Sequence, residues 1–143
     1  MILYLDTSAL VKLLVEEPES ELVVQLTEVS DTVVTSRIAY VEARSALARR
    51  RREKVLDAET HAHALKSLTQ LWANLVTVEL DEFRAGDLTG THDLRAFDAI
   101  HLASALIVRA HARDVPFHFC SFDVRQRVAA AAEHLDVVPP VIR

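Results

Sequence analysis

The stretch Ile2-Leu3-Tyr4-Leu5-Asp6-Thr7-Ser8 decides the fold that the sequence predicts. Four mostly apolar residues run directly into a carboxylate, and hydroxyl side chains follow it. A buried parallel strand delivers an acid in this way to the carboxyl edge of its sheet, where open α/β sheets bind ligands. Asp, Ser and Thr are also preferred helix N-caps, so this stretch alone fits Asp6 equally as a cap or as a functional acid.

Apolar and β-branched runs alternate with helical patterns along the rest of the chain. We expect strands at 2–5, 32–35, 75–80 and 117–122, and a short fifth strand at 137–138. We expect helices at 9–15, 19–29, 37–54, 57–72, 81–88, 98–112 and 123–135. Ser36 is expected to cap the third helix, and Gly90 to end the fifth. This alternation predicts an α/β fold with a central parallel sheet between layers of helices.

Length and composition favour a single domain spanning 1–143, since the 143 residues are 50% hydrophobic and include only 2 Gly. The single cysteine, Cys120, excludes an internal disulfide and fits a reducing compartment. We find no signal peptide and no long apolar run, so we expect a cytoplasmic protein without a membrane partner. The net charge of −5 argues against nucleic-acid binding through bulk charge, but a local basic patch or a metal ion could still serve.

Glu42 is the first of three further acids in unusual places. It shares one flank of its predicted helix with Ile38, Val41 and Ser45, which we expect to form an inward stripe together with Leu47. An isolated buried charge is very costly, so an acid on that flank must be paired or must bind a cation. A salt bridge to a neighbouring arginine, Arg37 or Arg44, is the alternative explanation.

Asp98 and Asp123 both stand where a helix is predicted to begin. Asp98 heads the most apolar helix of the chain, and Asp123 closes the fourth strand much as Asp6 closes the first. A hydroxyl residue accompanies each strand-end acid, Ser8 near Asp6 and Ser121 near Asp123. Helix capping would explain each acid separately. A parallel sheet, however, would gather all of them at one edge.

Clustered carboxylates repel one another and raise one another's pKa unless a cation is present. A few hard oxygen ligands suit Mg²⁺ or Mn²⁺ better than zinc. Such an ion can activate a water molecule and stabilise charge on a phosphoryl group. The pattern therefore favours metal-assisted phosphoryl chemistry at Asp6, Glu42, Asp98 and Asp123.

Two other features have plainer interpretations. His101 follows Asp98 by one helical turn on an apolar helix, which favours a hydrogen-bonded core histidine over a metal ligand. The basic run at 49–52 favours a solvated helix end whose cations complement the helix dipole. We also consider that some of these arginines hold a nucleic-acid backbone.

Four motifs together resemble the PIN-domain ribonucleases, and more narrowly the VapC-type toxins of bacterial type II toxin–antitoxin pairs. The motifs are the segment around Asp6, then Thr35-Ser36 with Tyr40-Val41-Glu42, then the segment from Leu94 to Ala103, and finally Ser121-Phe122-Asp123. The resemblance covers essentially the whole chain. It depends on the order and spacing of the four motifs, since each motif alone is weakly specific.

The resemblance implies a Rossmann-like PIN fold and RNA cleavage that depends on Mg²⁺ or Mn²⁺. It assigns the acidic site to Asp6, Glu42, Asp98 and Asp123, with Ser8 and Ser121 as accompanying hydroxyls. It also implies a homodimer and a VapB-type antitoxin that lies across the active site. The last motif departs from the family pattern because no second acid lies near Asp123, and the participation of Asp93 is open. The number of metal ions, one or two, is therefore open as well.

Two other functions remain as alternatives. The first is an aspartate-dependent phosphotransferase or receiver-like domain, although position 8 is a serine and no lysine follows Lys66. The second is a binding protein whose acidic pocket docks a basic peptide without catalysis. Chelator-sensitive RNA cleavage by the pure protein separates this second alternative from a nuclease.

Overall fold

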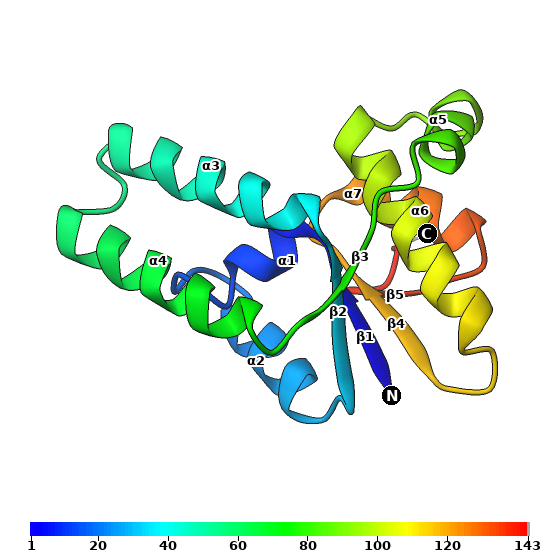
Figure 1. Cartoon of the computed structure of the whole chain (residues 1–143), viewed down its shortest axis with the longest axis horizontal. Coiled ribbons are helices and arrows are strands. Elements are labelled where there is room, and N and C mark those ends of the chain that lie inside the picture. The colour runs from blue at the N-terminus through cyan, green and yellow to red at the C-terminus, as the bar shows by residue number, and fades with distance from the viewer. Residues whose placement is uncertain (143) are drawn as a thin grey trace.

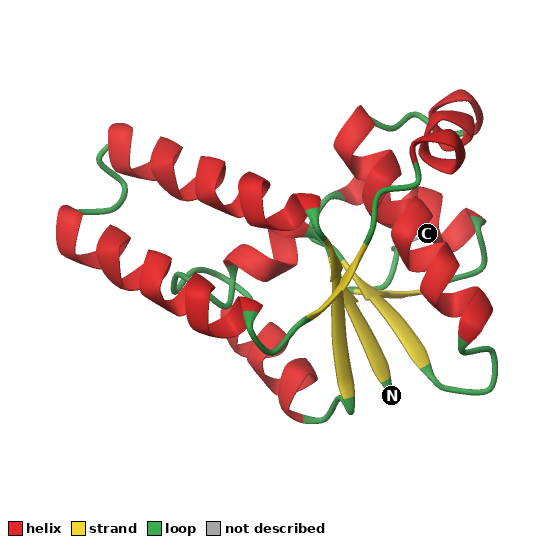
Figure 2. Ribbon diagram, in the orientation of Figure 1, coloured by secondary structure: helices red, strands yellow, loops and turns green. Residues whose placement is uncertain are grey.

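The computed structural model describes residues 1–142, and a five-stranded, all-parallel sheet forms its centre. The strand order is β3-β2-β1-β4-β5, so the first strand of the chain is the middle strand of the sheet. Figure 2 shows the strands converging between two groups of helices. The predicted α/β class is confirmed. The strands are β1 (Ile2–Leu5), β2 (Thr32–Ser36), β3 (Val76–Val78), β4 (Phe117–Cys120) and β5 (Asp136–Val138).

Alternate side chains of β1 enter two separate hydrophobic cores. Leu3 and Leu5 belong to the core on one face of the sheet, and Tyr4 belongs to the core on the other face with Phe119. All of these side chains are fully buried. This is the consequence of the two-residue period of a strand when both faces of its sheet are covered by helices.

The first core is covered by α1 (Thr7–Val11), α2 (Ser20–Glu28), α3 (Ile38–Arg52) and α4 (Ala58–Trp72). The second is covered by α5 (Glu82–Thr91), α6 (Ala96–His111) and α7 (Val124–Ala132). Figure 1 shows α3 and α4 as a long hairpin that extends beyond the sheet, with the other group of helices on the opposite side. No helix within residues 1–142 is long and apolar enough to span a membrane.

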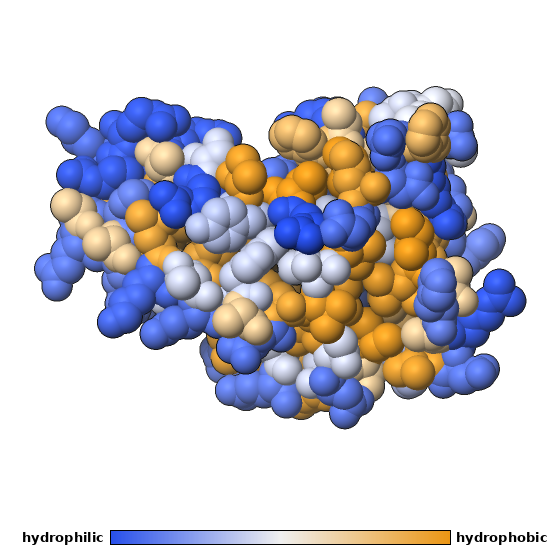
Figure 3. Space-filling model, viewed as in Figure 1, coloured by the Kyte–Doolittle hydropathy of each residue, from blue (hydrophilic) through white to orange (hydrophobic). Residues whose placement is uncertain are grey.

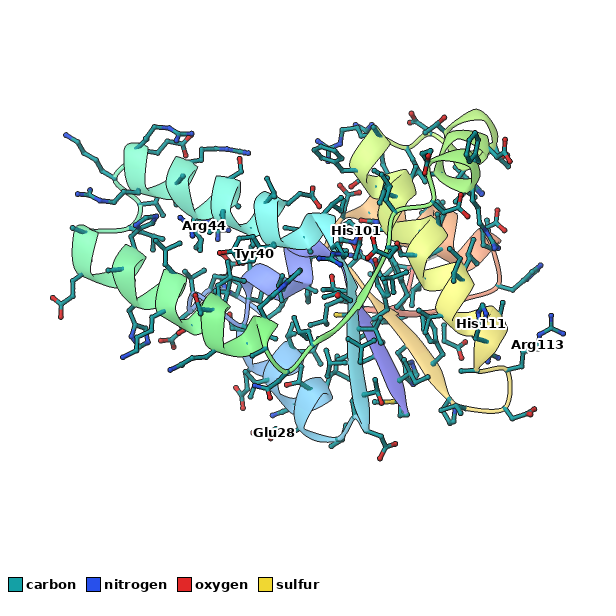
Figure 4. The ribbon with its side chains drawn as sticks, viewed as in Figure 1. Glu28, Tyr40, Arg44, His101, His111 and Arg113 are labelled. Carbon is teal, nitrogen blue, oxygen red and sulfur yellow. The ribbon has the colours of Figure 1, made fainter. Side chains whose placement is uncertain are left out.

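Aromatic and cationic side chains hold the α3–α4 hairpin together. The rings of Tyr40 and Trp72 meet edge to face at 5.3 Å, and the Arg44 guanidinium lies 6.0 Å from the Tyr40 ring. Figure 4 shows Tyr40 and Arg44 on the side of α3 that faces α4. Figure 3 shows that hydrophilic side chains cover the outer end of the hairpin, whereas hydrophobic ones gather over the middle of this face of the molecule.

The strand order places a topological switch point beside β1. The chain proceeds from β1 outward to β2 and β3, and then returns to the other side of β1 with β4 and β5. The connections after β1 and β4 therefore leave on opposite faces of the sheet. Open α/β sheets bind ligands in the crevice that this reversal leaves at their carboxyl edge.

Several predicted details are wrong. Ser36 is the last residue of β2 and not a cap, since α3 has Arg37 as its N-cap without a side-chain capping bond. Gly90 lies inside α5, which continues to Thr91. The inward face of α3 consists of Ala39, Ala43 and Leu47, whereas Val41 is 70% exposed. The small alanines allow α3 to pack closely against its neighbours. Of the stripe expected at Ile38, Val41, Ser45 and Leu47, only Leu47 is buried.

Candidate active site

The carboxyl ends of β1 and β4 open into a cavity of about 540 Å³ between the start of α1, the middle of α3 and the start of α6. Figure 4 shows His101 of α6 beside the ends of the strands. The predicted acids Asp6, Glu42, Asp98 and Asp123 all line this cavity, as does Ser8. Its other lining residues are Thr7, Ala46, Arg49, Arg95, Ala96, Phe97 and His101.

Asp6 lies at the floor of the cavity and is only 3% exposed. Its Oδ1 accepts hydrogen bonds from the Ser8 hydroxyl at 2.6 Å and from the Ala9 backbone N–H at 2.9 Å. Its Oδ2 accepts one from the Ser121 hydroxyl at 2.5 Å. Asp6 is therefore the N-cap of α1 and also a member of the acidic cluster, so the two interpretations of this residue do not exclude each other. Burial raises its pKa, and these hydrogen bonds reduce that rise.

Asp98 and Asp123 form a more open pair that is held by Arg95. The guanidinium of Arg95 lies 3.2 Å from Oδ2 of Asp98 and 3.2 Å from Oδ2 of Asp123, and its side chain is 74% exposed. Asp123 caps α7 through the Gln126 backbone N–H, which was the alternative interpretation of this acid. Asp98 is not a cap, because α6 begins at Ala96. Burial raises the pKa of Asp98, and Arg95 opposes that rise.

Glu42 reaches the cavity from the second turn of α3. Its Oε1 accepts a hydrogen bond from the Thr7 hydroxyl at 2.6 Å and lies 2.8 Å from Nε2 of His101. Burial alone would raise the pKa of Glu42, but the hydrogen bonds from His101 and Thr7 bring it below its ordinary value. The predicted alternative partners are wrong, since Arg37 pairs with Glu79 and Arg44 contacts Tyr40.

The donor set fits a hard divalent cation. All four acids present carboxylate oxygens, which Mg²⁺ and Mn²⁺ prefer, and a cation would offset the cost of burying Asp6. Within residues 1–142 no three His, Cys, Asp or Glu side chains are already arranged around a single metal position. Asp98 and Asp123 are turned to Arg95, and Glu42 to His101. An ion between Asp98 and Asp123 would take the place of the Arg95 charge.

The sequence did not decide the roles of Asp93 and of the basic run at 49–52. Asp93 does not line the cavity; its side chain is 95% exposed and 3.9 Å from Arg125. The basic run divides in two. Arg49 lines the cavity, whereas Arg50 pairs with Glu17 at 2.9 Å. Arg51 and Arg52 are exposed at the end of α3.

Sequence reasoning missed three residues that contact the acids, namely Thr7, Arg95 and His101 as a partner of Glu42. Thr7 could have been found, because it directly follows Asp6. Arg95 precedes Asp98 by three residues, which is a spacing that favours an ion pair at a helix start. The prediction that His101 is a hydrogen-bonded core histidine is confirmed, since it is 1% exposed and both ring nitrogens have partners. No local signal indicated that one of those partners is Glu42.

Comparison with known proteins agrees with this geometry. The PIN domain family model matches residues 3–132. Ribonuclease VapC49 of Mycobacterium tuberculosis is 43% identical over 110 residues, which cover 75% of this chain and 76% of that protein. The chain therefore belongs to the PIN-domain family, among the VapC ribonucleases.

Solved structures show the same fold at lower identity. M. tuberculosis VapC20, a toxin that cleaves the sarcin-ricin loop, matches with a TM-score of 0.65 and 19% identity over 89% of this chain and 94% of that one. A chain of VapBC2 from Rickettsia felis, bound to a DNA fragment from the promoter, matches with a TM-score of 0.65 and 13% identity. That match covers 96% of this chain and 97% of the other.

Proposed function

We propose that this protein is a divalent-metal-dependent endoribonuclease and the toxin of a VapBC-type toxin–antitoxin pair. The observation that carries the proposal is the convergence of four carboxylates on one cavity at the switch point of a parallel sheet. The hydroxyls of Thr7 and Ser8, which also line the cavity, donate to the carboxylates of Glu42 and Asp6. Family membership supports the same activity.

Asp6, Asp98 and Asp123, with Glu42, would hold Mg²⁺ or Mn²⁺. When bound, such an ion lowers the pKa of a water molecule and neutralises charge on the phosphoryl oxygens. Ser8 and Ser121 hold both oxygens of Asp6 in place, so the most buried ligand needs no rearrangement. Thr7 and His101 hold one oxygen of Glu42. The residues of the chain therefore supply fixed negative charge and orientation, which is the main protein contribution in phosphoryl chemistry.

The RNA would be held by local charge. Arg49 lines the acidic cavity, and Arg95 extends over it with a mostly exposed side chain. Both guanidiniums can bind phosphate oxygens with paired hydrogen bonds. This local grip is compatible with a chain whose formal net charge is −5. The RNA sequence that is cut is not defined by these contacts.

An antitoxin of the VapB type would block this cavity. A second groove of about 440 Å³ adjoins the acids and is lined by Ile38, Val41, Glu42, Ser45, Arg49 and Phe97. The groove lies between α3 and the start of α6. The exposed side chains of Val41 and Phe97 suit the apolar residues of a docked peptide, and the acids suit an inserted arginine.

The antitoxin can be sought by tagging the protein in its native host and identifying small co-purifying proteins by mass spectrometry. Co-expression of the recovered partner should restore growth. Harmless expression of active protein without any partner would contradict the toxin function and leave the nuclease function intact. The homodimer stays a prediction, for which mass measurement in solution is the test.

The phosphotransferase alternative is disfavoured by Asp6 itself. An aspartyl nucleophile needs a free carboxylate oxygen, but both oxygens of Asp6 accept hydrogen bonds and the residue is 3% exposed. The deciding experiment is cleavage of single-stranded RNA by the pure protein with Mn²⁺ or Mg²⁺ and with chelator. Cleavage that is lost with chelator and restored by metal supports the proposal, and binding of basic peptides without cleavage contradicts it.

A further inference from the structure

His101 lies at the back of the acidic cavity with both ring nitrogens engaged. Nδ1 is 2.9 Å from the Tyr4 hydroxyl, and Nε2 is 2.8 Å from Oε1 of Glu42. The ring is 1% exposed, and Figure 4 shows it between α3 and the strands. His101 thus connects the middle strand of the sheet to the acid that α3 contributes.

The direction of both hydrogen bonds follows from the chemistry of the partners. A carboxylate can only accept, so Nε2 of His101 must carry the proton that it shares with Glu42. The hydroxyl of Tyr4 can donate a hydrogen bond as well as accept one. A neutral imidazole has one donor and one acceptor nitrogen. Both contacts are therefore satisfied by a single tautomer, in which Nδ1 accepts from Tyr4.

Two donors converge on the same oxygen of Glu42. The Thr7 hydroxyl donates to Oε1 at 2.6 Å, and Oγ1 of Thr7 is itself 3.0 Å from Nε2 of His101. Among residues 1–142, Oε2 of Glu42 accepts no hydrogen bond. The carboxylate is thus held by one oxygen, and the other remains available to the cavity that Glu42 lines.

The other end of this chain of contacts is fixed in the core. Tyr4 is fully buried and stacks on Phe119 at 5.4 Å with an interplanar angle of 11°. Its ring also meets His101 edge to face at 5.9 Å. The aromatic packing fixes the ring and with it the position of the hydroxyl oxygen, so the imidazole is held relative to the strand.

We propose that Tyr4 and His101 form a positioning relay that fixes the orientation of Glu42 in the acidic site. The catalytic consequence of the relay rests on the proposed nuclease function. Its hydrogen-bond pattern can be tested without that function. In this relay His101 acts through Glu42, by selecting one orientation of its carboxylate. Partners that orient the ligands of a metal in this way are typically worth about 10- to 100-fold in affinity or activity.

The tautomer is the first test and needs neither metal nor RNA. Long-range nitrogen–proton NMR of the imidazole in metal-free protein should show His101 protonated at Nε2 and unprotonated at Nδ1. Tyr4→Phe keeps the ring stack and removes only the donor to Nδ1, so the Nδ1 resonance should shift while Nε2, still held by the Glu42 carboxylate, keeps its proton. A wild-type ring protonated at Nδ1 alone, or an unchanged spectrum in Tyr4→Phe, overturns the relay.

Kinetics supply the second test. His101→Leu should lower kcat by about 10- to 100-fold with little change in KM, because substrate contacts are kept while the Glu42 orientation is lost. His101→Gln should recover part of the loss, since its amide can donate to Glu42. Tyr4→Phe should lower kcat less than His101→Leu does. If His101→Leu does not fold, His101→Gln and Tyr4→Phe still carry the test.

A matched control is His92→Gln, which alters a comparable contact, 2.7 Å from His92 Nε2 to Glu133 Oε1, outside the cavity. It should leave kcat unchanged. If His101→Leu keeps the wild-type kcat while Glu42→Gln is inactive, the relay is overturned. The nuclease function is not affected by that outcome. Wild-type cleavage by Glu42→Gln instead contradicts the proposed site and the catalytic consequence of the relay, and the NMR result then decides the tautomer by itself.

Discussion

The two sides of the acidic cavity are built differently. Asp6 is buried at the end of the middle strand, and both its oxygens are held by neighbouring hydroxyls and a backbone N–H. Asp98 and Asp123 lie at the starts of helices and are joined by Arg95, whose side chain is 74% exposed. One side is therefore rigid and desolvated, and the other is adjustable. An ion or a phosphate can displace an exposed arginine at a small cost in free energy. An ion that binds Asp6 must instead accept the orientation in which the hydrogen bonds hold this carboxylate.

The largest expected effect comes from removing a charge on the adjustable side. Asp98→Asn should keep the fold and lower kcat for RNA cleavage by about 10²- to 10³-fold, the cost typical of losing one fixed electrostatic contact with a transition state. Expression of the variant should no longer inhibit growth. Asp93→Asn is the matched control, because Asp93 is 95% exposed and lies outside the cavity. Near wild-type cleavage by purified Asp98→Asn would show that the site is assigned wrongly.

A smaller effect, on RNA binding, is expected from substitutions in the basic run at 49–52, of which only Arg49 lines the cavity in the part of the chain that the structure describes. Arg49→Ala should weaken RNA binding for all sequences alike and reduce the slope of log Kd against log salt by about 0.7, the value for one phosphate contact on a single strand. Arg52→Ala removes an equal charge from the exposed end of α3 and should change the slope less. Filter binding across a salt series measures both. Equal slopes in Arg49→Ala and wild type would make Arg49 a solvated helix residue.

Removing Arg95 tests how easily a cation enters between Asp98 and Asp123, on the adjustable side of the cavity. In Arg95→Ala an incoming cation no longer competes with a guanidinium, so the Kd for Mn²⁺ should fall. Exposed ion pairs are worth about 0.2–1 kcal/mol each, so the loss of the two pairs that Arg95 makes should lower the Kd by about two- to thirtyfold. Calorimetric titration of metal into the apo protein measures it. A weaker Mn²⁺ affinity in the variant would indicate that Arg95 orients the two acids for the ion.

The smallest expected effect is on stability in the absence of metal. Burial raises the pKa of Asp98 in the folded protein above its ordinary value of 3.8. The stabilisation by its protonated form is therefore complete below the unfolded-state pKa and is lost as pH rises through the folded-state pKa. Asn does not titrate, so the Tm of Asp98→Asn relative to wild type should increase by a few degrees over that pH interval.

The same melts with metal provide the control. Mn²⁺ should raise the Tm of the wild type by mass action and that of Asp98→Asn less. Equal metal-induced shifts in the two proteins would mean that the ion binds elsewhere. A Tm difference that stays constant with pH in chelator would mean that burial does not raise the pKa of Asp98.

The sequence by itself determined the features that depend on local chemistry. An apolar run followed by Asp6 predicts a buried strand that ends in an acid, because hydrophobicity and capping act within a few residues. The same reasoning correctly predicted a parallel α/β sheet from the alternation of strands with helices. The sequence also indicated the four acids that line one cavity. Their assignment to a nuclease site came from the resemblance to a family, which depends on the order and spacing of four motifs.

Only the tertiary structure decided which residues meet. The Ser121 hydroxyl reaches Asp6 across 115 residues of sequence, and His101 reaches Glu42 across 59. The Ser121 contact depends on β4 lying beside β1, a choice of strand order that no local pattern contains. The His101 contact depends on how α6 and α3 lie relative to each other. The buried face of α3 was also decided by its neighbours. Ala39 and Ala43 face inward because close helix packing favours small side chains there, while Val41 is left beside the cavity, where hydrophobicity alone would not have placed it.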